Sequence, residues 1–302
     1  MVAVLAGGTG GAKLARGMLD VVGADELVVI ANTADDIEVY GAHVSPDPDL
    51  IAYALADVLD ERGYGISDDT WAVMDALAGA GRDTWFRLGD RDLALCLIRT
   101  ELLHAGLRLS EAHAEVVAGL GLSARILPMA DEPVRTQVQA RGRWRAFQEF
   151  MIVDGAAGPV EEVELRGVEA ARPTPEVLEA IAAAEAIVIG PSNPVISIGP
   201  ILAVPGMRDA LAEANAPIVA VSPFVGGRAV KGPTEAFCAH ASIAPSAQGI
   251  ADTYAGVIDG LVADEPVAGL PALELDTLMD TPEARKRVAA ATLDFARSLA
   301  AR

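Results

Sequence analysis

Short apolar runs alternate with longer amphipathic segments along the chain. Residues 1–6 and 26–31 are continuous apolar runs bounded by polar loops, which predicts two buried β-strands, and the segment 11–22 between them has helical periodicity. A β-loop-α-β opening of this kind is typical of a doubly wound parallel sheet. Similar strand-like runs recur farther along the chain, at 123–129, 135–141, 160–167, 186–190, 217–222 and 256–262.

Segments with helical periodicity fall between these strands, separated by glycine and proline clusters. Helices are expected at 50–61, 68–79, 89–105, 110–119, 175–184 and 282–301. The first four follow one another without an intervening strand. We therefore expect one Rossmann-like α/β domain over residues 1–302, with a mostly parallel sheet, helices on both faces and a mainly helical insertion at about 50–120.

The composition is that of a soluble globular protein. Of the 302 residues, 52% are hydrophobic and 22% are charged, and no apolar run approaches the roughly 20 residues that span a bilayer. The apolar N-terminal run lacks a preceding basic region, so we interpret it as a strand rather than a signal peptide and expect a cytoplasmic location. The net charge of −20 argues against a nucleic-acid or membrane partner. Two distant cysteines and four scattered histidines argue against a disulfide framework or a zinc site.

The glycine-dense segment "AGGTGGAKLARGM" (6–18) joins the first strand to the first helix. Backbone N–H groups of such a turn can approach a phosphate, and the helix N-terminus adds about half a positive charge. The spacing matches neither the dinucleotide fingerprint, whose third glycine is replaced by Lys13, nor the P-loop, because Leu14 follows the lysine. The turn is interpreted as a generic anion site; the alternative is tight strand–helix packing without a ligand.

Three further polar loops follow predicted buried strands. "NTADDIEVYGAHVSPDPDL" (32–50) carries four aspartates, which are hard oxygen ligands suited to magnesium, although Asp47 or Asp49 could instead cap the following helix. "GPSNPVISIGP" (190–200) supplies small polar groups, and "SPFVGGRAVKGP" (222–233) supplies two cationic side chains, Arg228 and Lys231. Loops that follow parallel strands share one edge of a sheet, so together they predict one cleft for an anionic ligand.

Two other features bear on the chemistry. The chain has only three lysines, and Lys13 and Lys231 both lie in glycine-dense loops, which makes these loops candidate phosphate sites.

"WFRLGDRD" (85–92) precedes an apolar helix instead of following a strand. Its charged residues can bind a ligand or can only cap the helix and form surface ion pairs.

These stretches, in this order, resemble the 2-phospho-L-lactate transferase family of coenzyme F-420 biosynthesis. The match covers nearly the whole chain; "LGDRD" and "PSNPVISIGPIL" are its specific motifs, while "GGTGG" and "NTADD" are shared with a wider superfamily. The resemblance implies a homodimeric, magnesium-dependent transferase with a Rossmann-like core. It implies a donor that is a guanosine diphosphate ester of lactate, enolpyruvate or glycerate. The phosphorylated three-carbon acid would move to the ribityl 5′-hydroxyl of the deazaflavin Fo, and GMP would leave.

The resemblance also implies roles for individual residues. Asp47 and Asp49 are the expected catalytic carboxylates, Fo is expected to contact them together with Asp90 and Arg91, and magnesium is expected at Asp36, Asp47 and Asp49. Nucleotide contacts are expected in the glycine-rich and small-residue loops, at Gly7, Gly8, Thr9, Gly10, Gly11, Lys13, Asn32, Ser192, Asn193, Ser197, Gly227, Arg228 and Lys231.

Part of the predicted acceptor pocket depends on residues near these motifs. An apolar wall is expected from Trp71, Trp85 and Phe86. Two positions depart from the family's pattern: Leu50 stands where threonine is common, and Cys96 stands where histidine is common.

Three alternatives accompany this interpretation. A nucleotide-sugar-binding regulatory protein of the same superfamily would share the glycine and aspartate loops, but "LGDRD" and "PSNPVISIGP" favour the transferase. An NAD(P)-dependent oxidoreductase would fit the strand–glycine–helix opening, but the fingerprint spacing argues against it. For Arg91, the alternative to contact with Fo is an ion pair that only holds its own turn.

Overall fold

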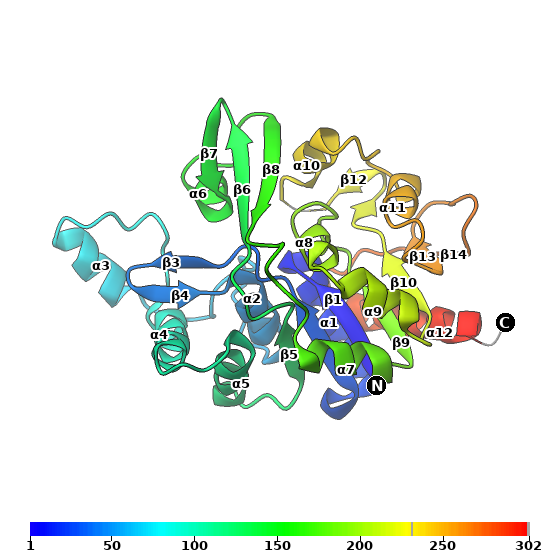
Figure 1. Cartoon of the computed structure of the whole chain (residues 1–302), viewed down its shortest axis with the longest axis horizontal. Helices are drawn as coiled ribbons and strands as arrows, with labels where there is room; N and C mark the ends of the chain where they lie inside the picture. The colour runs from blue at the N-terminus through cyan, green and yellow to red at the C-terminus, as the bar shows by residue number, and fades with distance from the viewer. Residues whose placement is uncertain (231, 301–302) are drawn as a thin grey trace.

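A seven-stranded parallel sheet forms the centre of the computed structural model, which describes residues 1–230 and 232–300 (Figure 1). Its strand order is β14-β13-β10-β9-β1-β2-β5, and all neighbouring strands run parallel. The expected α/β fold is therefore confirmed. The strands are β1 (Val2–Ala6), β2 (Leu27–Ala31), β5 (Arg125–Pro128), β9 (Ala186–Ile189), β10 (Ile218–Val221), β13 (Gly260–Ala263) and β14 (Ala272–Glu274).

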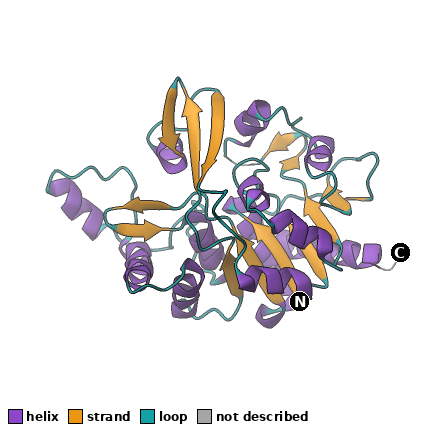
Figure 2. Cartoon of the chain, viewed as in Figure 1, coloured by secondary structure: helices purple, strands orange, loops and turns teal. Residues whose placement is uncertain are grey.

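Helices cover both faces of this sheet (Figure 2), because successive side chains of a strand point to opposite faces. In β1, Ala3 and Leu5 enter one apolar core, while Val2 and Val4 enter the other. The first core is closed by α7 (Pro175–Ala183), α8 (Ile198–Ala203), α9 (Met207–Glu213) and α11 (Ala247–Thr253). The second is closed by α1 (Gly8–Val22), α2 (Pro46–Leu55), α5 (Leu109–Gly119) and α12 (Pro282–Ala300).

Two additions with small cores of their own project from the sheet in different directions (Figure 1). The first packs the hairpin of β3 (Ile37–Val39) and β4 (Ala42–Val44) against helices α3 (Ala72–Gly79) and α4 (Asp90–His104). The second is an antiparallel sheet that packs against two short helices: β6 (Arg135–Ala140), β7 (Arg143–Ala146), β8 (Val160–Arg166), α6 (Phe147–Ile152) and α10 (Thr234–His240).

Some elements differ from the sequence predictions. The helix expected at 50–61 begins at Pro46 and ends at Leu55, so Asp47 and Asp49 lie within its first turn instead of before it. The strand expected at 256–262 begins only at Gly260, because a turn through Gly256, at φ 75°, precedes it. Three short structures lie where loops are expected: β3–β4, β14, and the hairpin of β11 (Phe224–Val225) with β12 (Arg228–Ala229). Strands of two or three residues are too short to show periodicity.

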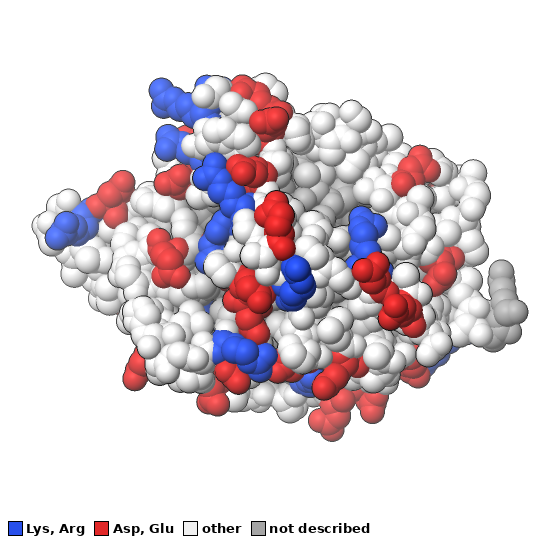
Figure 3. All heavy atoms as spheres, in the orientation of Figure 1, with Lys and Arg blue, Asp and Glu red and all other residues white. Residues whose placement is uncertain are grey.

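Charged side chains are distributed over several elements on the face shown in Figure 3, with acidic groups interspersed among arginines. None of the helices in the described residues combines the length and the apolar character that crossing a membrane requires.

The glycine turn packs directly against the loop that follows β9. A Cβ atom on Gly10 would lie 2.0 Å from the carbonyl oxygen of Pro191, and one on Gly11 would lie 2.7 Å from Ser192 Oγ. Gly8 has a φ of 61°, which favours glycine. These glycines therefore allow α1 to start against a neighbouring loop, as the packing interpretation of the turn requires.

We expect Gly10→Ala to lower the free energy of unfolding by at least about 2 kcal/mol, because the added methyl group meets a backbone atom that cannot move freely. The matched control is Gly79→Ala in α3, where an added Cβ meets no atom within 4 Å; its effect should stay below about 1 kcal/mol. Urea denaturation followed by circular dichroism measures both. Equal stabilities of the two variants would contradict this packing argument.

Candidate functional site

A cavity of about 970 Å³ opens where the central strands end. Gly8, Asp35, Ser192 and Ser222 each line it from a different loop, after β1, β2, β9 and β10 respectively. Ligands of open parallel sheets bind at this edge, and the volume suits a ligand of nucleotide size. The structure thus brings four of the predicted loops to one cavity.

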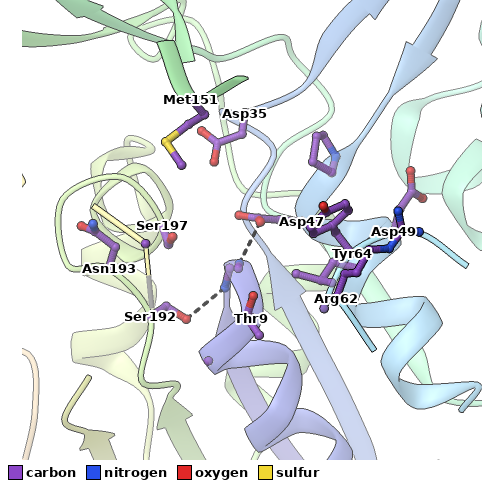
Figure 4. Close-up of a pocket in the computed structure, with 18 of the residues that line it drawn as sticks. Thr9, Asp35, Asp47, Asp49, Arg62, Tyr64, Met151, Ser192, Asn193 and Ser197 are labelled. Carbon is purple, nitrogen blue, oxygen red and sulfur yellow. Dashed lines mark hydrogen bonds between the residues drawn. The ribbon is translucent and has the colours of Figure 1, made fainter. Parts of the chain in front are cut away.

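One end of the cavity is rich in hydrogen-bond donors. The first turn of α1 and Lys13 line this end together with Ser192, Asn193 and Ser197 (Figure 4). Asn193 Oδ1 accepts the N–H groups of Val195 and Ile196, while its buried Nδ2 meets no partner among the residues that the structure describes. An unpaired buried donor beside a helix N-terminus suits an anionic group of a ligand.

Asp47 lies in the middle of this region and points into the cavity (Figure 4). Its Oδ1 accepts the N–H of Gly8 at 2.7 Å, and its Oδ2 accepts Nδ2 of Asn32 at 2.9 Å. Asn32 does not line the cavity; it also donates to the Ile196 carbonyl and so acts through Asp47. Burial raises the pKa of Asp47 to about 6.

Asp35 is the second carboxylate that faces this space (Figure 4). It is 5% exposed, and its Oδ1 has no hydrogen-bond partner in the part of the chain described. Burial, and then the charge of Asp47, hold the pKa of Asp35 well above its usual range. Two carboxylates beside a site for anions fit a divalent cation, because Mg²⁺ usually takes one or two carboxylates together with substrate phosphates.

The other two aspartates of this loop are held by protein partners. Asp49 lines the cavity, but its two oxygens accept Nη1, at 3.1 Å, and Nη2 of the fully buried Arg99. Asp36 lies outside the cavity lining, and its Oδ2 pairs with His43 Nε2 at 3.1 Å. The sequence alone does not distinguish the four aspartates. In the structure, Asp49 and Asp36 pair with basic side chains, whereas Asp35 and Asp47 do not.

Aromatic side chains form the other end of the cavity. Trp71, Trp85 and Phe86 line it, as does Tyr64, which is 61% exposed. The guanidinium groups of Arg62 and Arg87 lie 5.5 and 5.1 Å from the centre of the Trp71 ring. Sequence reasoning missed Arg62 and Tyr64, because their segment is interpreted only as a helix break. The signal that could have revealed them is an aromatic residue between two glycines, Gly63 and Gly65.

The residues expected to contact Fo from the "LGDRD" turn are not in the cavity lining. Asp90 caps α3, because it accepts Thr70 Oγ1 at 2.6 Å and two backbone N–H groups at 3.0 Å. Arg91 is exposed and donates to the Ser67 carbonyl at 3.2 Å. Helical periodicity turns Asp92 inward and Arg91 outward, and the bond of Arg91 goes to a carbonyl instead of to a neighbouring acid.

The remaining expected residues lie around the cavity in different ways. Gly7 and Thr9 line it, whereas Gly11 is buried against Ala6 and Ser192. Gly227 and Arg228 belong to the exposed turn of the β11–β12 hairpin, and Val225, Val230 and Gly232 line the cavity in their place. Lys231 lies outside the described residues.

Comparison with known proteins identifies the family. The model of the family described as 2-phospho-L-lactate transferase CofD matches residues 2–287. The chain belongs to this family. A phosphoenolpyruvate transferase of Kitasatospora aureofaciens is 39% identical, with 98% of this chain and 97% of the relative covered. A 2-phospho-L-lactate transferase of Methanosarcina mazei is 37% identical, with 95% and 97% covered.

The comparison of structures supports the fold alone. A crystal structure of a UPF0052 family protein from Bacillus halodurans aligns with a TM-score of 0.62 at 17% identity. The alignment covers 97% of this chain and 98% of that one. The CofD family membership therefore comes from sequence, while the shared architecture extends to more distant proteins.

Both departures from the CofD family's pattern lie at or beneath the cavity. Leu50 is part of the lining. Cys96 is fully buried in α4, with its Sγ 3.9 Å from Oδ1 of Asp92. Asp92 lines the cavity and accepts the Tyr53 hydroxyl at 2.7 Å. Burial, and then the charge of Asp49, raise the pKa of Asp92 to about 6.

Replacing Asp47 and replacing Asp49 should lower the free energy of unfolding by different amounts. We expect Asp49→Asn to lower the free energy of unfolding by about 3–5 kcal/mol, because the variant leaves the buried Arg99 charge without its partner. Asp47→Asn should cost less, about 1–2 kcal/mol, because it leaves no buried charge unpaired and loses only one of the two hydrogen bonds that Asp47 accepts. Urea denaturation at pH 7.5 compares the two. Similar losses in both variants would contradict this division of roles.

The raised pKa of Asp92 predicts a pH-dependent stability. Folding raises this pKa from 3.8 to about 6, so ionisation costs the folded state stability as the pH rises between these values. Asp92→Asn does not ionise at this position. We expect its stability to match the wild type near pH 4 and to exceed it by up to about 3 kcal/mol above pH 7. A pH-independent difference in thermal unfolding would show that the Asp92 charge is not the cause.

Proposed function

We propose that this protein transfers a phosphorylated three-carbon acid from its guanosine diphosphate ester to the ribityl 5′-hydroxyl of the deazaflavin Fo. GMP is the leaving product, and the reaction belongs to coenzyme F-420 biosynthesis. The observation that carries the proposal is a single cavity with an anion-binding end and an aromatic end, in a chain that belongs to the CofD family.

The donor's diphosphate occupies the end formed by α1. Backbone N–H groups of the glycine turn, Lys13 and the unpaired amide of Asn193 provide positive charge and hydrogen-bond donors there. Phosphoryl transfer depends mainly on positioning and on stabilising the charge that spreads over the phosphoryl oxygens. Donors that are already fixed by the backbone supply both without reorganising during the reaction.

Fo occupies the aromatic end. Its flat ring system needs an apolar wall with a few polar contacts, which Trp85, Phe86 and Tyr64 offer. The ribityl chain then extends toward Asp47, so that its terminal hydroxyl meets the phosphorus atom between the two ends. The new bond joins that oxygen to phosphorus, the bond from phosphorus to the GMP oxygen breaks, and the hydroxyl proton passes to the Asp47 carboxylate as general base.

Asp35 and Asp47 are the residues that would hold magnesium. When bound, the metal neutralises phosphate charge that these carboxylates would otherwise repel. Asp49 is assigned a positioning role because the charge of Arg99 already balances it, and Asp36 because it lies outside the cavity lining and pairs with His43. Asp49 connects α2 to α4 and thereby fixes the first turn of α2, which carries Asp47.

The three-carbon acid on the donor is best identified by comparing the reaction rates of the candidate donors. The relative from Kitasatospora aureofaciens is named for phosphoenolpyruvate and that from Methanosarcina mazei for 2-phospho-L-lactate, at similar identity to this chain. The assay therefore includes the lactate, enolpyruvate and glycerate esters of guanosine diphosphate.

We expect GMP release from one of these donors only when both Fo and Mg²⁺ are present, with one product formed per GMP. Chelation should abolish the reaction, and Asp47→Asn should lower kcat at least about 100-fold. Glu101→Gln, on the exposed face of α4, is the control and should leave kcat unchanged. Chromatographic quantification of GMP measures each rate. Failure with all three donors would refute the proposed reaction, and full activity after chelation would refute the metal requirement alone.

A further inference from the structure

Asp92 presents an unused acceptor to the aromatic end of the cavity. The carboxylate is 9% exposed and comes from the buried face of α4. Its Oδ1 accepts the Tyr53 hydroxyl at 2.7 Å and lies near the Cys96 thiol. In the described residues, no side chain or backbone group donates to its Oδ2. Because Asp92 lines the cavity, this oxygen is available to a ligand that donates a hydrogen bond.

The residue that faces this oxygen has no side chain. It is Gly65, and a Cβ added there would lie in ordinary van der Waals contact with Asp92 Oδ2, at 4.0 Å. Gly65 itself lines the cavity, in the same turn as Tyr64. Because Gly65 carries no side chain and Asp92 also lines the cavity, a ligand edge can approach Oδ2 from the cavity side.

The position of Asp92 is fixed by its neighbours. The Tyr53 hydroxyl holds one oxygen from α2, and the backbone N–H of Asp92 donates to Asp69 Oδ2 at 3.1 Å. Ile66, Leu88 and Trp85 supply apolar surface to the cavity lining. A fixed acceptor in a largely apolar setting selects for a planar group that carries an N–H on its edge, because an ionised carboxylate can only accept hydrogen bonds.

We propose that Asp92 accepts, through Oδ2, a hydrogen bond from the imide N–H of the deazaflavin ring, and so determines which edge of the acceptor enters the cavity. This inference rests on the proposed function. The imide edge carries a neutral donor between two carbonyl groups. The opposite edge of Fo carries an acidic phenol, whose anion would be repelled by the ionised Asp92.

The test measures equilibrium binding of Fo to the full-length protein by calorimetry. Asp92→Asn keeps the size of the side chain but presents an amide in place of a carboxylate. We expect it to weaken Fo binding at least tenfold and to leave GDP binding unchanged. Glu101→Gln, on the exposed face of the same helix, is the control and should bind both ligands like the wild type.

A second ligand makes the test specific. Fo methylated at the imide nitrogen lacks the donor, so it should bind the wild type at least tenfold more weakly than Fo. It should bind Asp92→Asn about as well as Fo does, because the partner is already lost. Unchanged Fo binding by Asp92→Asn, or an equal effect of methylation in both proteins, would overturn the inference. Wild-type protein that binds GDP but no Fo would instead refute the proposed acceptor.

Discussion

The hydrogen bonds of Asp47 hold the site together. Its two oxygens join the start of α1, through Gly8, to the end of β2, through Asn32, while its backbone begins α2. This junction requires close approach: a Cβ on Gly7 would lie 2.7 Å from Asp47 Oδ2. Three segments distant in sequence therefore converge on one carboxylate, and the donor-rich end of the cavity forms around it.

Buried carboxylates surround the cavity, and each is balanced differently. Asp49 has a full counter-charge in Arg99, whereas Asp35 and Asp92 each have an oxygen that receives no donor from residues 1–230 and 232–300. Such unpaired groups destabilise the free protein, and they are concentrated where ligands are expected. The protein thus retains electrostatic strain at the two ends of the cavity, where a cation and an N–H donor would relieve it.

The aromatic end depends on an addition to the central fold. The segment between β2 and β5 builds its own small core from the β3–β4 hairpin and from α3 and α4. That core positions Trp85 and Phe86. Arg62, which precedes Trp71 in the sequence, and Arg87, which follows it, both place their guanidinium groups over the Trp71 ring. In a chain with a net charge of −20, these arginines and Lys13 bring positive charge to the cavity.

The sequence by itself determined the parallel sheet and the edge where the loops meet, because continuous apolar runs and glycine turns are local signals. Motif order likewise indicated the family. Tertiary structure alone decided which carboxylates have a counter-charge: Asp47 and Asp49 are two positions apart, yet only Asp49 meets Arg99, fifty residues away. It also turned Arg91 outward and Asp92 inward, since the rotation of a helix about its axis is fixed by the core on which it packs.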